Sequence, residues 1–131
     1  MQVKRIVVAD DARFARKYLI RCLEMAGLYE MDVREAENGR EAIQIIEQLT
    51  GAGETIDLLV TGVNMPEMGG EELLAFIKGN AKLQKIPVLV ISSMVTELRY
   101  KALKELGACE VLKKPVTPPA LTDALALDGW S

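Results

Sequence analysis

The sequence contains no histidine and only two cysteines, and these absences limit the chemistry that its side chains can perform. Without histidine the chain lacks the most common general base and the most common metal ligand. Cys22 and Cys109 are too few for a disulfide framework and form no CxxC pair. Cys22 shares a helical spacing with Ala15, Leu19 and Ala26, so we interpret it as a small buried apolar residue. We therefore do not expect the chain to be an enzyme that turns over on its own.

A basic excess and long apolar runs are also absent. The net charge of −3 argues against a nucleic-acid-binding surface, which would need a basic stripe. No run approaches the roughly 20 apolar residues that a membrane span requires, and the first ten residues carry no signal-peptide pattern. We expect a cytoplasmic protein of one domain, because the chain has 131 residues of ordinary globular composition without repeats or linkers.

Short apolar segments alternate with longer amphipathic ones along the chain. The pattern predicts strands over Val3–Ala9, Met31–Ala36, Ile56–Thr61, the segment that Pro87 opens (VLVIS) and Cys109–Leu112. It predicts helices over Ala12–Ala26, Arg40–Leu49, Glu71–Lys78 and Glu97–Leu106, and a last helix with Thr117 as its cap, Pro118 or Pro119 in its first turn and Asp128–Gly129 at its end.

Five strand–helix units imply an α/β fold with helices on both faces of a parallel sheet. A flavodoxin-like sheet with strand order 2-1-3-4-5 fits this number of units, and ligands of such sheets bind beyond the carboxyl ends of the strands. One rim of the sheet should then collect five residues that lie at or just after strand ends: Asp10, Asp11, Gly62, Ser92 and Lys114.

Asp10 and Asp11 are consecutive carboxylates at the end of the first strand. Carboxylates, a few carbonyl oxygens and water are the usual ligands of Mg²⁺. The alternative is that one of them only caps the following helix. The other polar residues at the same rim favour the binding site.

These residues, the segment Ile56–Gly70 (IDLLVTGVNMPEMGG) and the pair Lys114–Pro115 resemble the receiver domain of two-component response regulators of the chemotaxis type. The resemblance covers the whole chain, 1–131, as a single receiver domain, and we expect no output domain. In that family the position of Gly62 holds the aspartate that accepts a phosphoryl group. Here that carboxylate is missing.

The resemblance also implies roles for the other rim residues. The acidic pair Asp10–Asp11, the acceptor and a backbone carbonyl two residues later, here that of Asn64, bind Mg²⁺ in receivers, so we expect Mg²⁺ binding to be weak or absent. Ser92 and Lys114 would contact the phosphoryl group, and the Lys114–Pro115 bond is typically cis. With no carboxylate at position 62, we predict that Lys114 pairs with Asp10 or Asp11.

Two further departures from the family occur. Val111 stands where many receivers carry an aromatic switch residue, and Gly69 stands in MGG where MDG is usual. By resemblance, docking or dimerisation would use Val111, Arg99, Tyr100 and Lys113, although an ordinary solvated helix face remains the alternative.

Other acceptors fit poorly. Asp57 opens the third predicted strand, and five residues at about 3.3 Å each place it roughly 16 Å from the rim. Thr61 adjoins Gly62, but strand alternation turns its side chain to the other face, and its hydroxyl would need a base.

We therefore interpret the chain as a response-regulator receiver domain that acts through protein docking and is not phosphorylated at the usual site. Its expected partners are a sensor histidine kinase or another signalling protein, with a homodimer left open and no nucleic acid or membrane. One alternative is an ordinary phospho-accepting receiver in which Gly62 replaced the acceptor. A remote one is a flavodoxin-like cofactor-binding protein, which the acidic segment after the first strand disfavours, because it would repel a phosphate.

Overall fold

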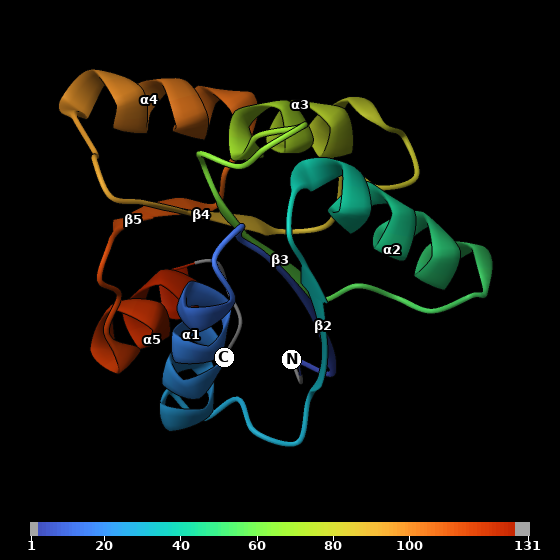
Figure 1. The fold of residues 1–131 in the computed structure, drawn as a ribbon, viewed down its shortest axis with the longest axis horizontal. Helices are drawn as coiled ribbons and strands as arrows, with labels where there is room; N and C mark the ends of the chain where they lie inside the picture. Colours follow the sequence, from blue (N-terminus) through green and yellow to red (C-terminus); the bar gives the residue numbers. More distant parts are fainter. Residues whose placement is uncertain (1–2, 128–131) are drawn as a thin grey trace.

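A computed structural model describes residues 3–127 of the chain (Figure 1). In this part five strands form one parallel sheet in the order β2-β1-β3-β4-β5. The predicted fold class and strand order are confirmed. The strands are β1 (Arg5–Ala9), β2 (Asp32–Ala36), β3 (Leu58–Gly62), β4 (Val88–Ser92) and β5 (Glu110–Lys113).

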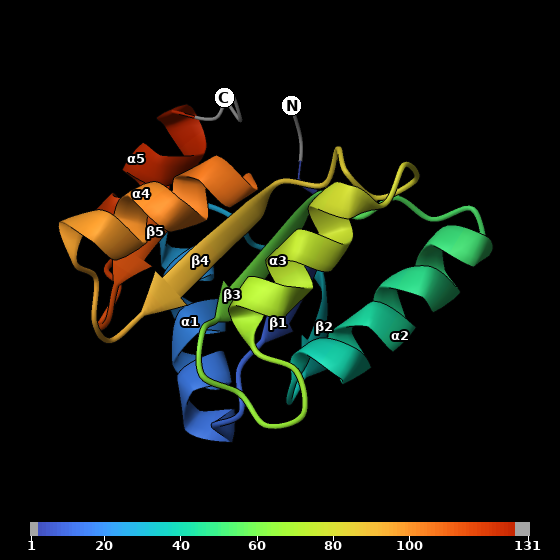
Figure 2. The same cartoon turned by 90° about the horizontal axis from the view of Figure 1, so that it is seen from above.

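Helices cover both faces of the sheet, as Figures 1 and 2 show. Helices α1 and α5 pack on one face, and α2, α3 and α4 pack on the other. Their bounds are α1 (Arg13–Met25), α2 (Gly39–Gly51), α3 (Gly70–Gly79), α4 (Glu97–Leu106) and α5 (Pro118–Leu127).

Strand alternation divides the core into two clusters that share the sheet. Val60 of β3 packs with Leu23 and Leu121, which belong to α1 and α5. Its neighbour Leu59 packs with Leu74 of α3 and the residues around it. Since β3 is buried at every position, its near-continuous apolar sequence is explained by helices on both sides.

The sequence placed the elements correctly but misplaced several ends. The first strand begins at Arg5 rather than Val3, and the third strand begins at Leu58 rather than Ile56 and ends at Gly62. Asp57 precedes it, because its carboxylate accepts hydrogen bonds from the backbone N–H groups of Lys4 and Arg5. The second helix begins one residue before the predicted Arg40 and extends to Gly51.

The predicted cap of the last helix is confirmed, since the Thr117 hydroxyl accepts a hydrogen bond from the N–H of Ala120 at 3.3 Å. Its predicted end, Asp128–Gly129, lies outside the described residues.

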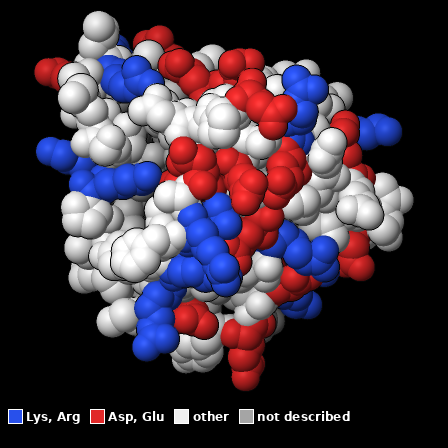
Figure 3. All heavy atoms as spheres, viewed as in Figure 1, with Lys and Arg blue, Asp and Glu red and all other residues white. Residues whose placement is uncertain are grey.

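Charges of both signs are mixed on the face that Figure 3 shows. Acidic side chains gather in the middle of this face, basic side chains lie beside them, and uncharged side chains gather at the lower left, over α1 and α5. Within residues 3–127, every helix is too short or too polar to cross a membrane.

Candidate functional site

The carboxyl ends of four strands bring the predicted polar residues to one rim. Asp10 follows β1, Gly62 ends β3, Ser92 ends β4 and Lys114 follows β5. The ammonium Nζ of Lys114 lies 2.9 Å from Oδ2 of Asp10, although the two residues are 104 positions apart. Lys114 therefore pairs with Asp10, as predicted.

Both oxygens of the Asp10 carboxylate are engaged within the protein. Oδ2 accepts from Lys114, and Oδ1 accepts a hydrogen bond of 2.9 Å from the N–H of Ala12. Asp10 is buried, with 7% of its surface exposed, whereas Asp11 is exposed. The cap alternative is wrong in its strict form, because Ala12 is the N-cap of α1 and makes no side-chain cap bond. Asp10 instead fixes the turn that leads into the helix.

Gly62 stands directly beside this ion pair. A Cβ atom added at Gly62 would lie 3.0 Å from Oδ2 of Asp10, which is closer than ordinary van der Waals contact. A side chain at position 62 would therefore require the Asp10 carboxylate to shift slightly. The carbonyl of Gly62 accepts a hydrogen bond from the Thr61 hydroxyl at 2.9 Å, which accounts for that buried hydroxyl.

The loop after β5 is tied to the end of β4. The Lys114–Pro115 peptide bond is cis, as the resemblance implied. The N–H of Lys114 donates to the carbonyl of Ser92 at 2.8 Å. The Ser92 hydroxyl is buried and donates to the carbonyl of Met94 at 2.9 Å. This hydrogen bond stabilises the turn of the chain directly after β4. Ser92 and Lys114 therefore lie together at the rim.

The rim lacks one carboxylate of the metal site that the resemblance implied, because position 62 is glycine. Each oxygen of Asp10 already accepts one hydrogen bond, Asp11 is exposed, and Asn64 is exposed in the loop after β3. Among residues 3–127, no group of three or more His, Cys, Asp or Glu residues could hold a metal ion. The backbone carbonyl of Asn64 is the one predicted ligand that does not depend on a side chain.

Asp57 lies at the opposite end of the sheet, where it accepts hydrogen bonds from Lys4 and Arg5 at the start of β1. The sequence-based argument that it is remote from the rim is confirmed. Thr61 is fully buried, and its hydroxyl is bonded to the carbonyl of Gly62. Neither residue presents an acceptor group to the rim.

The predicted docking residues do not share one environment. Val111 is buried in the core, with 5% of its surface exposed, so its inclusion in a docking surface is wrong. Val111 lies on β5, and its side chain is buried in the core against the helices on that face of the sheet. Lys113 is exposed, and on α4 Tyr100 is exposed and Arg99 is partly exposed. The Tyr100 hydroxyl donates to the Glu110 carboxylate at 2.6 Å, which raises the pKa of Tyr100.

Sequence reasoning missed Arg16, which supports the rim from α1. Its side chain is buried, Nη1 donates to the carbonyl of Asp10 at 2.7 Å, and Nε donates to Glu35 at 2.9 Å. A charged residue on the otherwise apolar face of Leu19 and Cys22 was the available signal.

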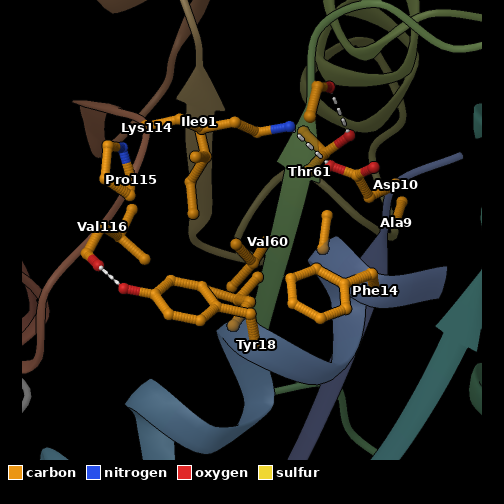
Figure 4. Close-up of a pocket in the computed structure, with 13 residues that line it drawn as sticks. Ala9, Asp10, Phe14, Tyr18, Val60, Thr61, Ile91, Lys114, Pro115 and Val116 are labelled. Carbon is orange, nitrogen blue, oxygen red and sulfur yellow. Dashed lines mark hydrogen bonds and ion pairs between the residues drawn. The ribbon is translucent and has the colours of Figure 1, made fainter. Parts of the chain in front are cut away.

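A cavity of about 270 Å³ beside the rim was also missed. Figure 4 shows it between α1 and the loop after β5, with the rings of Phe14 and Tyr18 along one side. The spacing of these two aromatic residues, one helical turn apart on α1, was the signal in the sequence.

The family model of the response regulator receiver domain matches residues 6–126. The chain belongs to this family. It is 31% identical over 113 residues to the two-component response regulator ORR11 of Oryza sativa subsp. indica, an alignment that covers 86% of this chain and 72% of the relative. It is 30% identical over 121 residues to the chemotaxis protein CheY1 of Helicobacter pylori, with 92% and 93% covered.

The fold of this receiver domain matches a solved complex of CheX with CheY, BeF₃ and Mg²⁺ from Borrelia burgdorferi. The TM-score is 0.80 at 23% identity, and the match covers 95% of this chain and 89% of that one. At this identity the similarity supports the fold alone. The chain is thus a two-component response regulator receiver domain by family and by architecture.

Proposed function

We propose that this receiver domain signals by docking to other signalling proteins and does not accept a phosphoryl group at the family's usual position. The observation that carries the proposal is at Gly62, where β3 ends at the rim without a carboxylate. The neighbouring groups that would serve a phosphoryl group are engaged with each other, since Lys114 is paired with Asp10. The domain is a binding module rather than an enzyme.

Receiver domains usually bind Mg²⁺, and the CheX–CheY complex contains it. In this chain we expect weak binding or none. Mg²⁺ would have to share the Asp10 carboxylate with Lys114 and the N–H of Ala12, and position 62 supplies no further carboxylate to bind it.

The proposed docking surface lies on α4 and the end of β5, on the residues that are accessible there. Arg99, Tyr100 and Lys113 supply polar contacts. Leu98 is 80% exposed and Met94 is 70% exposed, so apolar side chains stand beside them. Exposed apolar groups rimmed by polar ones are typical of protein-binding surfaces. A kinase or another signalling protein is the partner that fits a receiver domain.

Phosphorylation is tested directly by incubating the protein with Mg²⁺ and acetyl phosphate and measuring the intact mass. We expect no added phosphoryl group on the wild-type chain. A stoichiometric, acid-labile adduct of one phosphoryl group would contradict the proposal.

A second candidate is a receiver that lost its acceptor by substitution and kept the rest of the site. The retained Ser92 and Lys114, which lie together at the rim, favour it. The test is Gly62→Asp, with Gly62→Asn as a control of the same shape that cannot form an acyl phosphate. Phosphorylation of Gly62→Asp alone supports the second candidate. If both variants stay unmodified, restoring the acceptor alone does not restore phosphorylation, and the second candidate is wrong.

A further inference from the structure

The cavity beside the rim is apolar on most of its walls. Val60 and Ile91 line it from the sheet, Val116 lines it from the loop after β5, and Phe14 and Tyr18 line it from α1 (Figure 4). Phe14 is 84% exposed, so within the described residues most of this aromatic ring at the edge of the cavity is open to solvent. Pockets lined by apolar and aromatic side chains with a few polar groups are typical of small-molecule sites.

The polar groups around the cavity are almost all satisfied. The Tyr18 hydroxyl donates to the carbonyl of Val116 at 2.8 Å, and the Thr61 hydroxyl donates to Gly62. Within residues 3–127 no buried side-chain nitrogen or oxygen lacks a partner. Burying a charged ligand here would leave its charge without a compensating group, which is costly.

The charged groups at the rim end of the cavity determine which ligand it can accept. Lys114 and Asp10 neutralise each other, and the exposed Asp11 adds a negative charge next to them. An anion would therefore compete with Asp10 for Lys114. The ammonium carries three donors, and 38% of the Lys114 side chain is exposed, so it can donate to a neutral oxygen without leaving Asp10.

We propose that this cavity binds an uncharged aromatic molecule of about two rings that carries one hydrogen-bond acceptor, and that the acceptor points to Lys114. The size follows from the volume, because an apolar cavity of roughly 150 Å³ already admits benzene and this one has about 270 Å³. The ligand lies next to Gly62 and the Asp10–Lys114 pair, where it biases the rim that phosphorylation biases in other receivers. This regulatory role rests on the proposed function, but binding itself does not.

The test is a titration of the full chain with 2-naphthol, followed by ¹H–¹⁵N NMR at pH 7. We expect saturable shifts that centre on the amides of Phe14, Tyr18 and Val116. The anion 2-naphthoate has the same rings, and we expect it to bind at least about tenfold more weakly. Equal or tighter binding of 2-naphthoate, or no saturable shift with 2-naphthol, would overturn the proposal.

Two variants locate the site. Ala15 lines the cavity from α1, so Ala15→Leu should fill it and weaken 2-naphthol binding about tenfold or more. Ala75→Leu makes the same change on the exposed face of α3 and should bind like the wild type. Phe14→Ala changes an exposed side chain that the fold does not need, and it should also weaken binding.

Wild-type affinity in both Ala15→Leu and Phe14→Ala would place the binding elsewhere and overturn the proposal. A phosphoryl adduct in the acetyl phosphate experiment would contradict the proposed function and leave these binding results standing. The two inferences can therefore fail separately.

Discussion

Asp10 lies directly beside Gly62 and forms an ion pair with Lys114. Its carboxylate is held on one side by Lys114 and on the other by the N–H of Ala12. The ion pair stabilises the fold because only 10% of the Asp10 side chain is exposed. Without Lys114 the carboxylate would have little contact with water to replace the lost hydrogen bond. The polar groups next to Gly62 therefore satisfy one another without a side chain at position 62.

Replacing Lys114 with alanine should therefore destabilise the protein through Asp10. We expect Lys114→Ala to lower the free energy of unfolding by about 1–3 kcal/mol, as expected when a buried charged group loses its hydrogen-bond partner. Urea denaturation at pH 7 measures the change. Lys113→Ala is the matched control, because Lys113 is the exposed neighbour and should change stability by less than about 0.5 kcal/mol. Equal losses in the two variants would contradict this account of the ion pair.

The start of α3 approaches the end of β3 so closely that only glycine fits at position 70. A Cβ atom on Gly70 would lie 1.9 Å from the carbonyl oxygen of Gly62, inside any tolerable contact distance. The N–H of Gly70 also donates to the carbonyl of Val63 at 2.9 Å, which holds the helix start against the strand. The geometry of this element junction fixes where the loop at the rim can run.

Substitution at Gly70 should consequently cost more than substitution elsewhere in the same helix. We expect Gly70→Ala to lower the free energy of unfolding by about 1–3 kcal/mol, the range for overpacking a tight site. Gly79→Ala has open space around its Cβ and should be neutral or stabilise by up to about 1 kcal/mol. Thermal and urea unfolding of both variants check the prediction, which is wrong if their order is reversed.

Helix α1 is joined to strand β2 through Glu35. Its carboxylate accepts hydrogen bonds from Arg16 and Lys17, both on α1. Burial raises the pKa of the Glu35 carboxyl, but the hydrogen bonds from Lys17 and Arg16 outweigh it and the pKa lies below its usual value. Because the folded-state pKa is lowered, this stabilisation is present above the ordinary carboxyl pKa and is lost as the pH falls through the folded value.

The stability of a Glu35→Gln variant should accordingly differ from wild type in a pH-dependent way. At pH 7 we expect the variant to be about 1 kcal/mol less stable. The difference should shrink as the pH falls from roughly 5 to 3, where the wild-type carboxylate takes up a proton. Urea midpoints across this range measure it. Glu24→Gln removes the same charge from an exposed position on α1 and should stay within about 0.5 kcal/mol throughout. A constant difference between the Glu35→Gln and wild-type curves would contradict the prediction.

For residues 3–127 as a whole, the features that we propose to bear on function lie at one end of the sheet. The Asp10–Lys114 pair, Gly62 and the aromatic-lined cavity lie together because the carboxyl ends of parallel strands meet at one edge. The apolar residues Met94 and Leu98 lie in the loop after β4 and at the start of α4, and thus belong to the same end of the molecule. A ligand in the cavity and a partner on α4 would both act near the loops that surround Gly62.

Most of the fold could be predicted from the sequence because local patterns encode it. Apolar runs such as Leu58–Val60 and helical stripes such as that of Leu19 and Cys22 identify each element within a few residues. Alternation of the two types then leaves a parallel sheet as the consistent arrangement. The ends of elements were less predictable, since the start of β3 depends on hydrogen bonds between Asp57 and a distant strand.

The sequence alone determined the alternation of strands and helices, the polar residues at strand ends and the absence of a carboxylate at position 62, because these follow from residue type and chain order. The strand order 2-1-3-4-5 came from the resemblance to receiver domains, and the structure confirmed it. Only the tertiary structure decided that Lys114 selects Asp10 over Asp11, that Val111 is buried and that a cavity opens beside α1. Each of these depends on side chains far apart in the chain, and their distances and burial are set by how the helices pack on the sheet.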